Sequence, residues 1–150
     1  MRALIQRVEK AGVEISGLIH AAIGQGMMVL VGIEQADNQE DVNWLVGKIA
    51  RLRIFDDENG VMNLSIADKG GELLVVSQFT LHASTKKGNR PSYYRASGPQ
   101  HAIPLYEAFL KQMEEETGRL VKSGIFGALM KVSLINDGPV TIFIDTKAKE

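Results

Sequence analysis

The sequence contains no cysteine, which excludes disulfides, thiolate zinc sites, iron–sulfur clusters and a cysteine nucleophile. It also lacks any run of about 18 apolar residues, so we expect no membrane-spanning helix and no membrane partner. The opening residues have no uninterrupted apolar core and no small-residue cleavage site, and we therefore expect no signal peptide. These absences suit a reducing compartment, and we predict a cytoplasmic location.

An excess of charge of either sign is also missing. The 17 Lys and Arg residues nearly balance 18 Asp and Glu residues, and the formal net charge is −1. Indiscriminate nucleic-acid binders are usually strongly basic, so this balance argues against one. The distribution is more informative, because the stretch between Glu72 and Glu107 holds no acidic residue. Four basic residues that we single out lie in that stretch: Lys86, Lys87, Arg90 and Arg95. A local surface of this kind allows an anionic partner.

The length and composition suit one domain with a packed core. The 150 residues are 45% hydrophobic and 23% charged, which is typical of a globular domain, and we assign residues 1–150 to one domain. Asp37 followed by Glu40 predicts a capped helix start, and apolar positions at helical spacing continue to Leu52. A second helix is predicted over 100–116, with Gly118 as its C-cap.

Short apolar or alternating segments predict the strands. They are 3–8, 13–15, 18–20, 27–33, 53–55, 62–66, 73–79, 128–135 and 140–144. The run 27–33 is typical of a central strand that is buried on both faces. About eight strands with two separated helices indicate an α+β fold, in which a curved, largely antiparallel, barrel-like sheet has two main helices packed outside.

Orthodox catalytic motifs are absent. The three histidines, His20, His82 and His101, do not have the spacing of a zinc-binding helix, and no Gly-x-Ser-x-Gly, Walker or Gly-x-Gly-x-x-Gly motif occurs. The acidic residues at 56–58 and 114–116 are typical of a solvated turn and a helix end. A contribution from His82 stays open, because it follows the unusual segment 77–81.

Two segments are unusual for their position. Ser-Gln-Phe-Thr-Leu at 77–81 ends the predicted buried strand with three hydrogen-bonding side chains around an aromatic one. Asn-Asp-Gly-Pro-Val-Thr at 136–141 places Gly138 and Pro139 between two strands, where glycine permits close backbone approach and proline can adopt a cis bond. Taken singly, the two segments can also be a capped strand end and a hairpin turn.

Together these segments resemble the D-aminoacyl-tRNA deacylase family, also called the D-tyrosyl-tRNA deacylases. The resemblance extends to segments 4–8, 53–55, 62–64, 90–92 and 130–134 and covers nearly the whole chain. It implies a homodimeric, metal-independent hydrolase without a cofactor, which cleaves the ester joining a D-amino acid to the terminal adenosine of tRNA. DNA is not an expected partner. Glycyl-tRNA mischarged on alanine tRNA is a second expected substrate, because glycine has no side chain to exclude.

The resemblance assigns the adenosine pocket and the catalytic set to four consecutive residues: Ser77, Gln78, Phe79 and Thr80. Backbone amides near Phe79 and Thr80 would stabilise the oxyanion, and Phe79 would offer its ring to the base. Thr80 is either a nucleophile or a hydrogen-bond donor. We favour hydrolysis assisted by the ribose 2′-hydroxyl, because the sequence offers no obvious base for Thr80.

The resemblance also assigns substrate binding to five further residues: Gly138, Pro139, Arg7, Phe126 and Met130. The Gly-cisPro motif of one subunit would enter the active site of its partner and exclude L side chains. Arg7 would brace this turn, and the other two residues would form the second pocket wall. Weak contacts to the phosphates of the acceptor end are expected from the four basic residues Lys86, Lys87, Arg90 and Arg95.

Three alternatives compete with deacylation. A non-catalytic RNA-binding dimer would use the basic loop and Phe79, and would bind uncharged RNA without cleaving an ester. An esterase or amidase for small-molecule D-amino acid esters would need no adenosine. A purely structural dimer would show neither activity.

Overall fold

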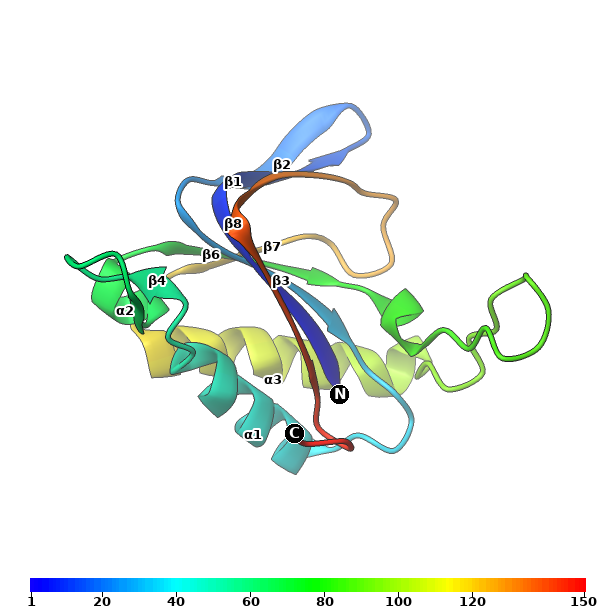
Figure 1. Cartoon of the computed structure of the whole chain (residues 1–150). Helices are drawn as coiled ribbons and strands as arrows, with labels where there is room; N and C mark the ends of the chain where they lie inside the picture. Colours follow the sequence, from blue (N-terminus) through cyan, green and yellow to red (C-terminus); the bar gives the residue numbers. More distant parts are fainter.

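The centre of the sheet is the long strand β1, to which three other strands pair in the computed structural model that describes residues 1–150. The six strands of this sheet are β1 (Arg2–Ile15), β2 (Leu18–Ile23), β3 (Gly26–Gly32), β6 (Glu72–Ser77), β7 (Val121–Ser123) and β8 (Lys131–Asp145). The order is β2-β1-β3-β6-β7, and β8 pairs with β1 along most of its length. Figure 1 shows the resulting curved sheet, with its β1–β2 end rising away from the helices.

The predicted α+β fold with a barrel-like sheet is confirmed, and the sheet is mixed. β1 is antiparallel to β2, β3 and β8, whereas β6 runs parallel to both β3 and β7. The parallel pairs follow from the connections, because parallel neighbours need a long crossover. One crossover contains α1 (Gln39–Ala50), and the other contains α3 (Pro99–Thr117).

The helices α1 and α3 lie together under one face of the sheet (Figure 1). The expected capping position is wrong by one residue, since Asn38 caps α1 and Asp41 completes the capping box. The Asp37 carboxylate is used elsewhere: it accepts from the Glu34 amide at 2.8 Å and pairs with the buried ammonium of Met1. α3 ends as predicted, with Gly118 in the left-handed conformation.

The strand predicted over 62–66 is present but shorter, and it belongs to a small hairpin that a short helix follows. β4 (Phe55–Asp56) and β5 (Met62–Leu64) form a short hairpin, and α2 (Ile66–Lys69) follows it. Ser65 caps α2 with its side chain, which explains why the alternation stops at Leu64. Neither α1 nor α3 combines the length and the hydropathy that crossing a membrane requires.

The core lies on both sides of the central strands. A cluster of 20 buried residues fills the space between the sheet and the helices, and a second cluster of 7 lies on the opposite face. Met27 and Val29 belong to the first cluster and Met28 to the second, which confirms the prediction that β3 is buried on both faces. The same alternation holds for β6, so its carboxyl end is rigidly placed.

The two strands predicted over 128–135 and 140–144 form one strand, β8, with an irregular middle. The register with β1 shifts between Gln6 and Val8 and again between Val8 and Lys10. Opposite these shifts, the Asn136 side chain accepts from the Val140 amide at 2.9 Å and donates to the Val140 carbonyl at 3.1 Å. An asparagine side chain therefore substitutes for a strand partner and closes a small loop around residues 137–139.

Candidate functional site

The candidate site begins where β6 ends. The strand was predicted to reach Phe79, but it stops at Ser77 and is followed by a short 3-10 helix, η1 (Phe79–His82). The Gln78 amide still donates to the Val31 carbonyl at 2.7 Å, so the turn starts from a fixed point. The turn carries the Phe79 ring out of the core, and 55% of its surface is exposed.

A hollow of about 360 Å³ lies beside this strand end. Five residues that the sequence singled out meet in its lining: Ser77, Gln78, Phe79, Phe126 and Met130. The first three come from the end of β6, and the other two come from the segment that leads into β8. Segments about fifty residues apart in the chain therefore form the two walls that the resemblance implies.

A buried tyrosine ties the two walls together. Tyr106, on the inner face of α3, donates from its hydroxyl to the Val75 carbonyl of β6 at 3.1 Å. Its ring centroid lies 5.8 Å from that of Phe126. Burial raises the pKa of Tyr106 to about 12, so the phenol stays a hydrogen-bond donor at neutral pH. The sequence carried no signal for this supporting role, because an apolar helix face predicts burial of Tyr106 but not its partner.

Thr80 does not line the hollow, but it contacts a residue that does. Its hydroxyl oxygen accepts a hydrogen bond from the Gln78 side-chain amide. His82 follows two residues later and is almost fully buried, and neither of its ring nitrogens has a hydrogen-bond partner. Burial lowers the pKa of His82 below its ordinary value, so the ring is neutral at pH 7. No contact makes His82 the base for Thr80.

Gly138 and Pro139 lie apart from this hollow. Their peptide bond is cis, both residues are exposed in the middle of β8, and neither lines the pocket of the same chain. Gly138 has φ +147°, and a β-carbon there would lie 2.8 Å from the Val140 amide nitrogen. Only glycine therefore fits this position without a shift of the loop.

Arg7 fastens the loop from beneath. Its Nε donates to the Asp137 carbonyl at 2.8 Å, and its Nη1 donates to the Ile54 carbonyl at 2.7 Å. Nη1 also pairs with Asp56 at 3.2 Å, so one buried guanidinium joins the β8 loop to the β4–β5 hairpin. Arg7 and Asp56 are far apart in the sequence, and no local pattern predicted that they form an ion pair.

The basic stretch forms an arm, residues 83–96, which projects from the body of the protein (Figure 1). Ser84 and Ser92 pair through two backbone hydrogen bonds of 2.7 and 2.9 Å and close the arm. Lys86, Lys87 and Arg90 are exposed and form no ion pair. Arg95 differs from them, because it pairs with the buried carboxylate of Glu34 at 2.8 Å.

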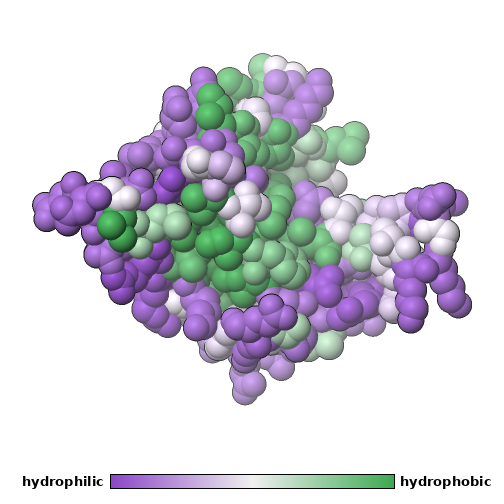
Figure 2. All heavy atoms as spheres, viewed as in Figure 1, coloured by the Kyte–Doolittle hydropathy of each residue, from purple (hydrophilic) through white to green (hydrophobic).

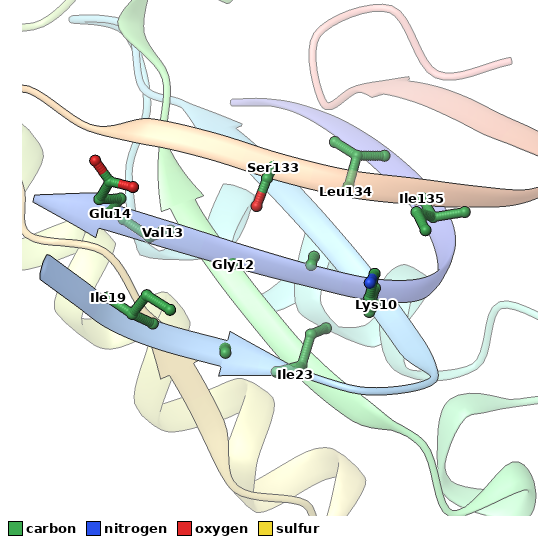
Figure 3. A pocket seen from close by; sticks show the side chains of 11 residues that line it. Lys10, Gly12, Val13, Glu14, Ile19, Ile23, Ser133, Leu134 and Ile135 are labelled. Atoms are coloured by element: carbon green, nitrogen blue, oxygen red, sulfur yellow. The ribbon is translucent and has the colours of Figure 1, made fainter. Parts of the chain in front are cut away.

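A second hollow lies at the other end of the sheet, between β1, β2 and β8 (Figure 3). Its lining is mainly apolar, and its two charged residues, Lys10 and Glu14, are separated along β1 (Figure 3). This groove contains no pair of groups suited to acid–base catalysis. No group of three or more His, Asp or Glu side chains in the chain is placed to hold a metal ion.

The fold and the site define an α+β protein with a hollow at the end of a central strand, which Phe79 and Phe126 line with aromatic rings. Family comparison assigns it further: the model of the D-Tyr-tRNA(Tyr) deacylase family matches residues 4–145, and the chain belongs to this family. The chain is similar to the D-aminoacyl-tRNA deacylases of Flavobacterium psychrophilum and Bacteroides thetaiotaomicron, with 63% and 60% identity over 150 residues that cover both chains completely. The resemblance noted in the sequence is thereby confirmed.

Solved structures show the same fold. A protein described as "c-Myc DNA Unwinding Element Binding Protein" superposes with a TM-score of 0.94 at 43% identity, over 99% of this chain and 100% of that one. A structure described as "a probable eukaryotic D-amino acid tRNA deacylase" has a TM-score of 0.81 at 17% identity, over 95% of this chain and 97% of that one. At that identity the second likeness concerns the fold alone.

Proposed function

We propose that this chain hydrolyses the ester bond of D-aminoacyl-tRNA and releases the D-amino acid and tRNA. The observation that carries the proposal is the hollow in which Ser77, Gln78, Phe79, Phe126 and Met130 meet. These are the pocket residues that the resemblance to the family implies. Relatives named for this activity are about 60% identical over the full chain, which supports the same assignment.

In this mechanism the terminal adenosine enters the hollow against Phe79, and the ester lies over the start of η1. The amides of Phe79 and Thr80 open this 3-10 helix, and the first amides of a helix have no carbonyl partner within it. They supply donors for the oxygen that becomes negative in the transition state. An aminoacyl ester is already reactive, so positioning and charge stabilisation provide the main acceleration.

Thr80 acts in this proposal as a hydrogen-bond donor. Its oxygen already accepts from the Gln78 amide, so its own proton is free to point to the substrate. The nearest histidine in sequence is buried and contacts no hydroxyl, which leaves Thr80 without a base. The ribose 2′-hydroxyl of the substrate orients or activates the attacking water instead. Each of these features favours substrate assistance over an acyl-enzyme.

The chiral filter requires a second copy of the chain. Gly138 and Pro139 lie outside the hollow of their own chain, and we propose that they complete the hollow of a partner subunit in a homodimer. Their carbonyls would crowd the substrate α-carbon, so an L side chain collides and a D side chain points away. Glycine is not excluded, and glycyl-tRNA mischarged on alanine tRNA is therefore a second substrate. Figure 2 shows hydrophobic side chains gathered over the middle of the face that carries β8, which suits a covered surface.

In this proposal the arm provides the contacts to tRNA beyond the terminal adenosine. Lys86, Lys87 and Arg90 are unpaired and free to meet phosphates of the acceptor end. Arg95 would have to share its guanidinium between Glu34 and a phosphate, so its contribution is the weakest of the four. A cytoplasmic location, independence of metal and the absence of a cofactor belong to the same proposal.

Matched D- and L-tyrosyl-tRNA, incubated with the purified chain in the presence of a chelator, test the proposal through loss of the ester. We expect rapid cleavage of the D form only. Cleavage that the chelator abolishes would contradict metal independence, and equal cleavage of both forms would contradict the chiral filter. Binding of uncharged tRNA without cleavage of either ester would favour the RNA-binding dimer instead.

A further inference from the structure

Two aromatic rings meet at the rim of the candidate pocket. The ring centroids of Phe79 and Tyr93 are 5.0 Å apart and their planes make an angle of 74°. Phe79 is 55% exposed and Tyr93 is 39% exposed. We call this pair the aromatic corner. Two adjoining exposed rings form a local apolar surface of the kind that marks a binding site.

Both halves of the corner are held by anchored backbone. Phe79 follows directly on the buried strand β6, whose end is fixed by the Gln78–Val31 hydrogen bond of 2.7 Å. Tyr93 is brought back to Phe79 by the Ser84–Ser92 pairing that closes the arm. The ion pair of Arg95 with buried Glu34 at 2.8 Å holds the chain just beyond Tyr93. The corner is thus a feature of the fold and not a chance contact between mobile side chains.

The exposed charges of the arm that carries Tyr93 are of one sign. Lys86, Lys87 and Arg90 of the arm have no acidic partner, and no acidic residue lies between Glu72 and Glu107 in the sequence. Exposed aromatic rings beside a positively charged surface are the combination that binds single-stranded nucleic acid, since the bases stack and the phosphates are attracted. The chemistry of the corner therefore fits one unpaired nucleotide.

We propose that the aromatic corner binds the base of the nucleotide that precedes the terminal adenosine, stacked on the exposed face of Tyr93, with its phosphate toward the arm. This inference rests on the proposed function, because it places the terminal adenosine in the neighbouring hollow. Phe79 lines that hollow and also contacts Tyr93, so the two sites adjoin as consecutive nucleotides do. Stacking reads no sequence, which suits a site that accepts any tRNA.

Binding of three stable analogues tests the inference. Each carries D-tyrosine in amide linkage to the 3′-position of adenosine: one is the nucleoside alone, one has cytidine before the adenosine, and one has an abasic ribose there. The last two share the phosphate and differ only in the base. We expect calorimetry to show the cytidine ligand binding about 5- to 150-fold more tightly than the abasic ligand, the gain that stacking of one base provides.

Variants at two neighbouring tyrosines show which residue provides the gain in affinity from the cytidine base. Tyr93→Leu keeps an apolar contact to Phe79 and is expected to abolish the difference between cytidine and abasic ligands, whereas Tyr93→Phe should preserve it. Tyr94→Leu is the matched control, because Tyr94 is exposed at the next position and pairs with no aromatic ring. The control should retain the full difference.

The outcomes separate this inference from the proposed function. Equal binding of the cytidine and abasic ligands, or a gain that survives in Tyr93→Leu, would overturn the aromatic corner even if D-aminoacyl esters are cleaved. A gain that depends on Tyr93, without cleavage of the corresponding esters, would keep the corner and remove the deacylase. Failure of all three ligands to bind would overturn both.

Discussion

The Thr80 hydroxyl accepts a hydrogen bond from the Gln78 side chain at the start of η1, and its own proton remains available to the substrate. Replacing Thr80 with alanine removes one donor from the proposed transition state. We expect kcat to fall by about 10- to 100-fold, the range for loss of one hydrogen bond to developing charge, while hydrolysis stays measurable. Single-turnover cleavage of D-tyrosyl-tRNA measures the change.

A threonine nucleophile makes a different prediction. Thr80→Ala would then lose all ester cleavage above the spontaneous rate, and acid quenching of the wild type would trap an acyl-enzyme. Thr80→Ser is the matched control, because it keeps the hydroxyl and should keep most of the rate under either mechanism. Detection of the trapped species would reinstate the nucleophile.

His82 is a buried histidine with two unpartnered ring nitrogens, and we expect its titration to affect stability. Burial lowers its pKa below the ordinary value, so the unfolded chain binds a proton more readily than the folded one. The protein therefore loses stability as the pH falls from about 6.5 toward the lowered pKa, and this loss is absent at higher pH.

His82→Leu should remove this pH dependence. Above pH 7 we expect the variant to be as stable as the wild type or more stable, by about 1 kcal/mol, because an unsatisfied buried polar group is removed. Between pH 6.5 and pH 5 the melting temperature of the variant should decline less than that of the wild type. Unaltered slopes in both proteins would show that another group titrates. Loss of ester cleavage in the variant would bring His82 back as a participant.

Among the elements, the arm depends on one ion pair that the sequence did not reveal. Arg95 covers the buried carboxylate of Glu34, and Arg95→Ala leaves that carboxylate without its partner. We expect a loss of about 1–3 kcal/mol in the free energy of unfolding, less than for a fully buried pair, because 39% of the Arg95 side chain is exposed to solvent. Urea denaturation measures it, with exposed Lys86→Ala as the control that should change stability by less than about 0.5 kcal/mol.

The same two variants separate anchoring from phosphate contact. Lys86→Ala should raise KM for aminoacyl-tRNA and weaken its dependence on salt, without changing cleavage of an aminoacyl-adenosine, which has no phosphate. Arg95→Ala should impair both substrates, because it loosens the segment whose Tyr93 packs against Phe79 of the hollow. If Arg95→Ala impaired only the tRNA substrate, Arg95 would be a phosphate contact like the others.

Local sequence patterns predicted most of the helices and strands, and each wrong prediction has a physical reason. Hydrophobic periodicity located α1, α3, β3 and β6, because each is a long or strongly apolar segment whose burial decides its conformation. It failed at the Asp37 cap, where a tertiary contact with the Met1 ammonium competes with the local helix signal. It also split β8 in two, because the Asn136 side chain continues the pairing where the backbone alone cannot.

The sequence predicted the residues of the candidate site that lie in its motifs, but not the residues that support them. Ser77 to Phe79, with Phe126 and Met130, was identified through the resemblance and meets in one hollow. The supporting contacts of Tyr106, Asp56 and Glu34 depend on which segments the fold brings together, and no local pattern contains that information. The pairing of Phe79 with Tyr93 belongs to the same class.

At the scale of the whole molecule, the separation of Gly138 and Pro139 from the hollow predicts subunit complementation. Phe79→Ala disables the pocket, and Gly138→Ala disables the motif, since its methyl group would meet the Val140 backbone within its own chain. When the two inactive variants are mixed and allowed to exchange, half of the dimers are mixed and one of their two sites is intact. We expect about one quarter of wild-type activity, the statistical yield of a twofold assembly.

A motif that serves its own chain would give a different result. The mixed population would then stay inactive, because every chain would carry one defect in its own site. Mixing two preparations of Phe79→Ala provides the control for exchange itself. Full D-selectivity in a demonstrated monomer would also contradict the shared site.

The pairing of β1 with β8 has a consequence for synthesis on the ribosome. β1 comprises residues 2–15, and its longest partner comprises residues 131–145, so the most extensive strand pair joins two segments that are synthesised far apart in time. At a synthesis rate of about 5–20 residues per second, about 6–25 seconds pass between the synthesis of β1 and that of β8. During that time one edge of the sheet's central strand is open to other nascent chains. We therefore expect translation speed and chaperone capture to influence how much of this protein reaches its native state.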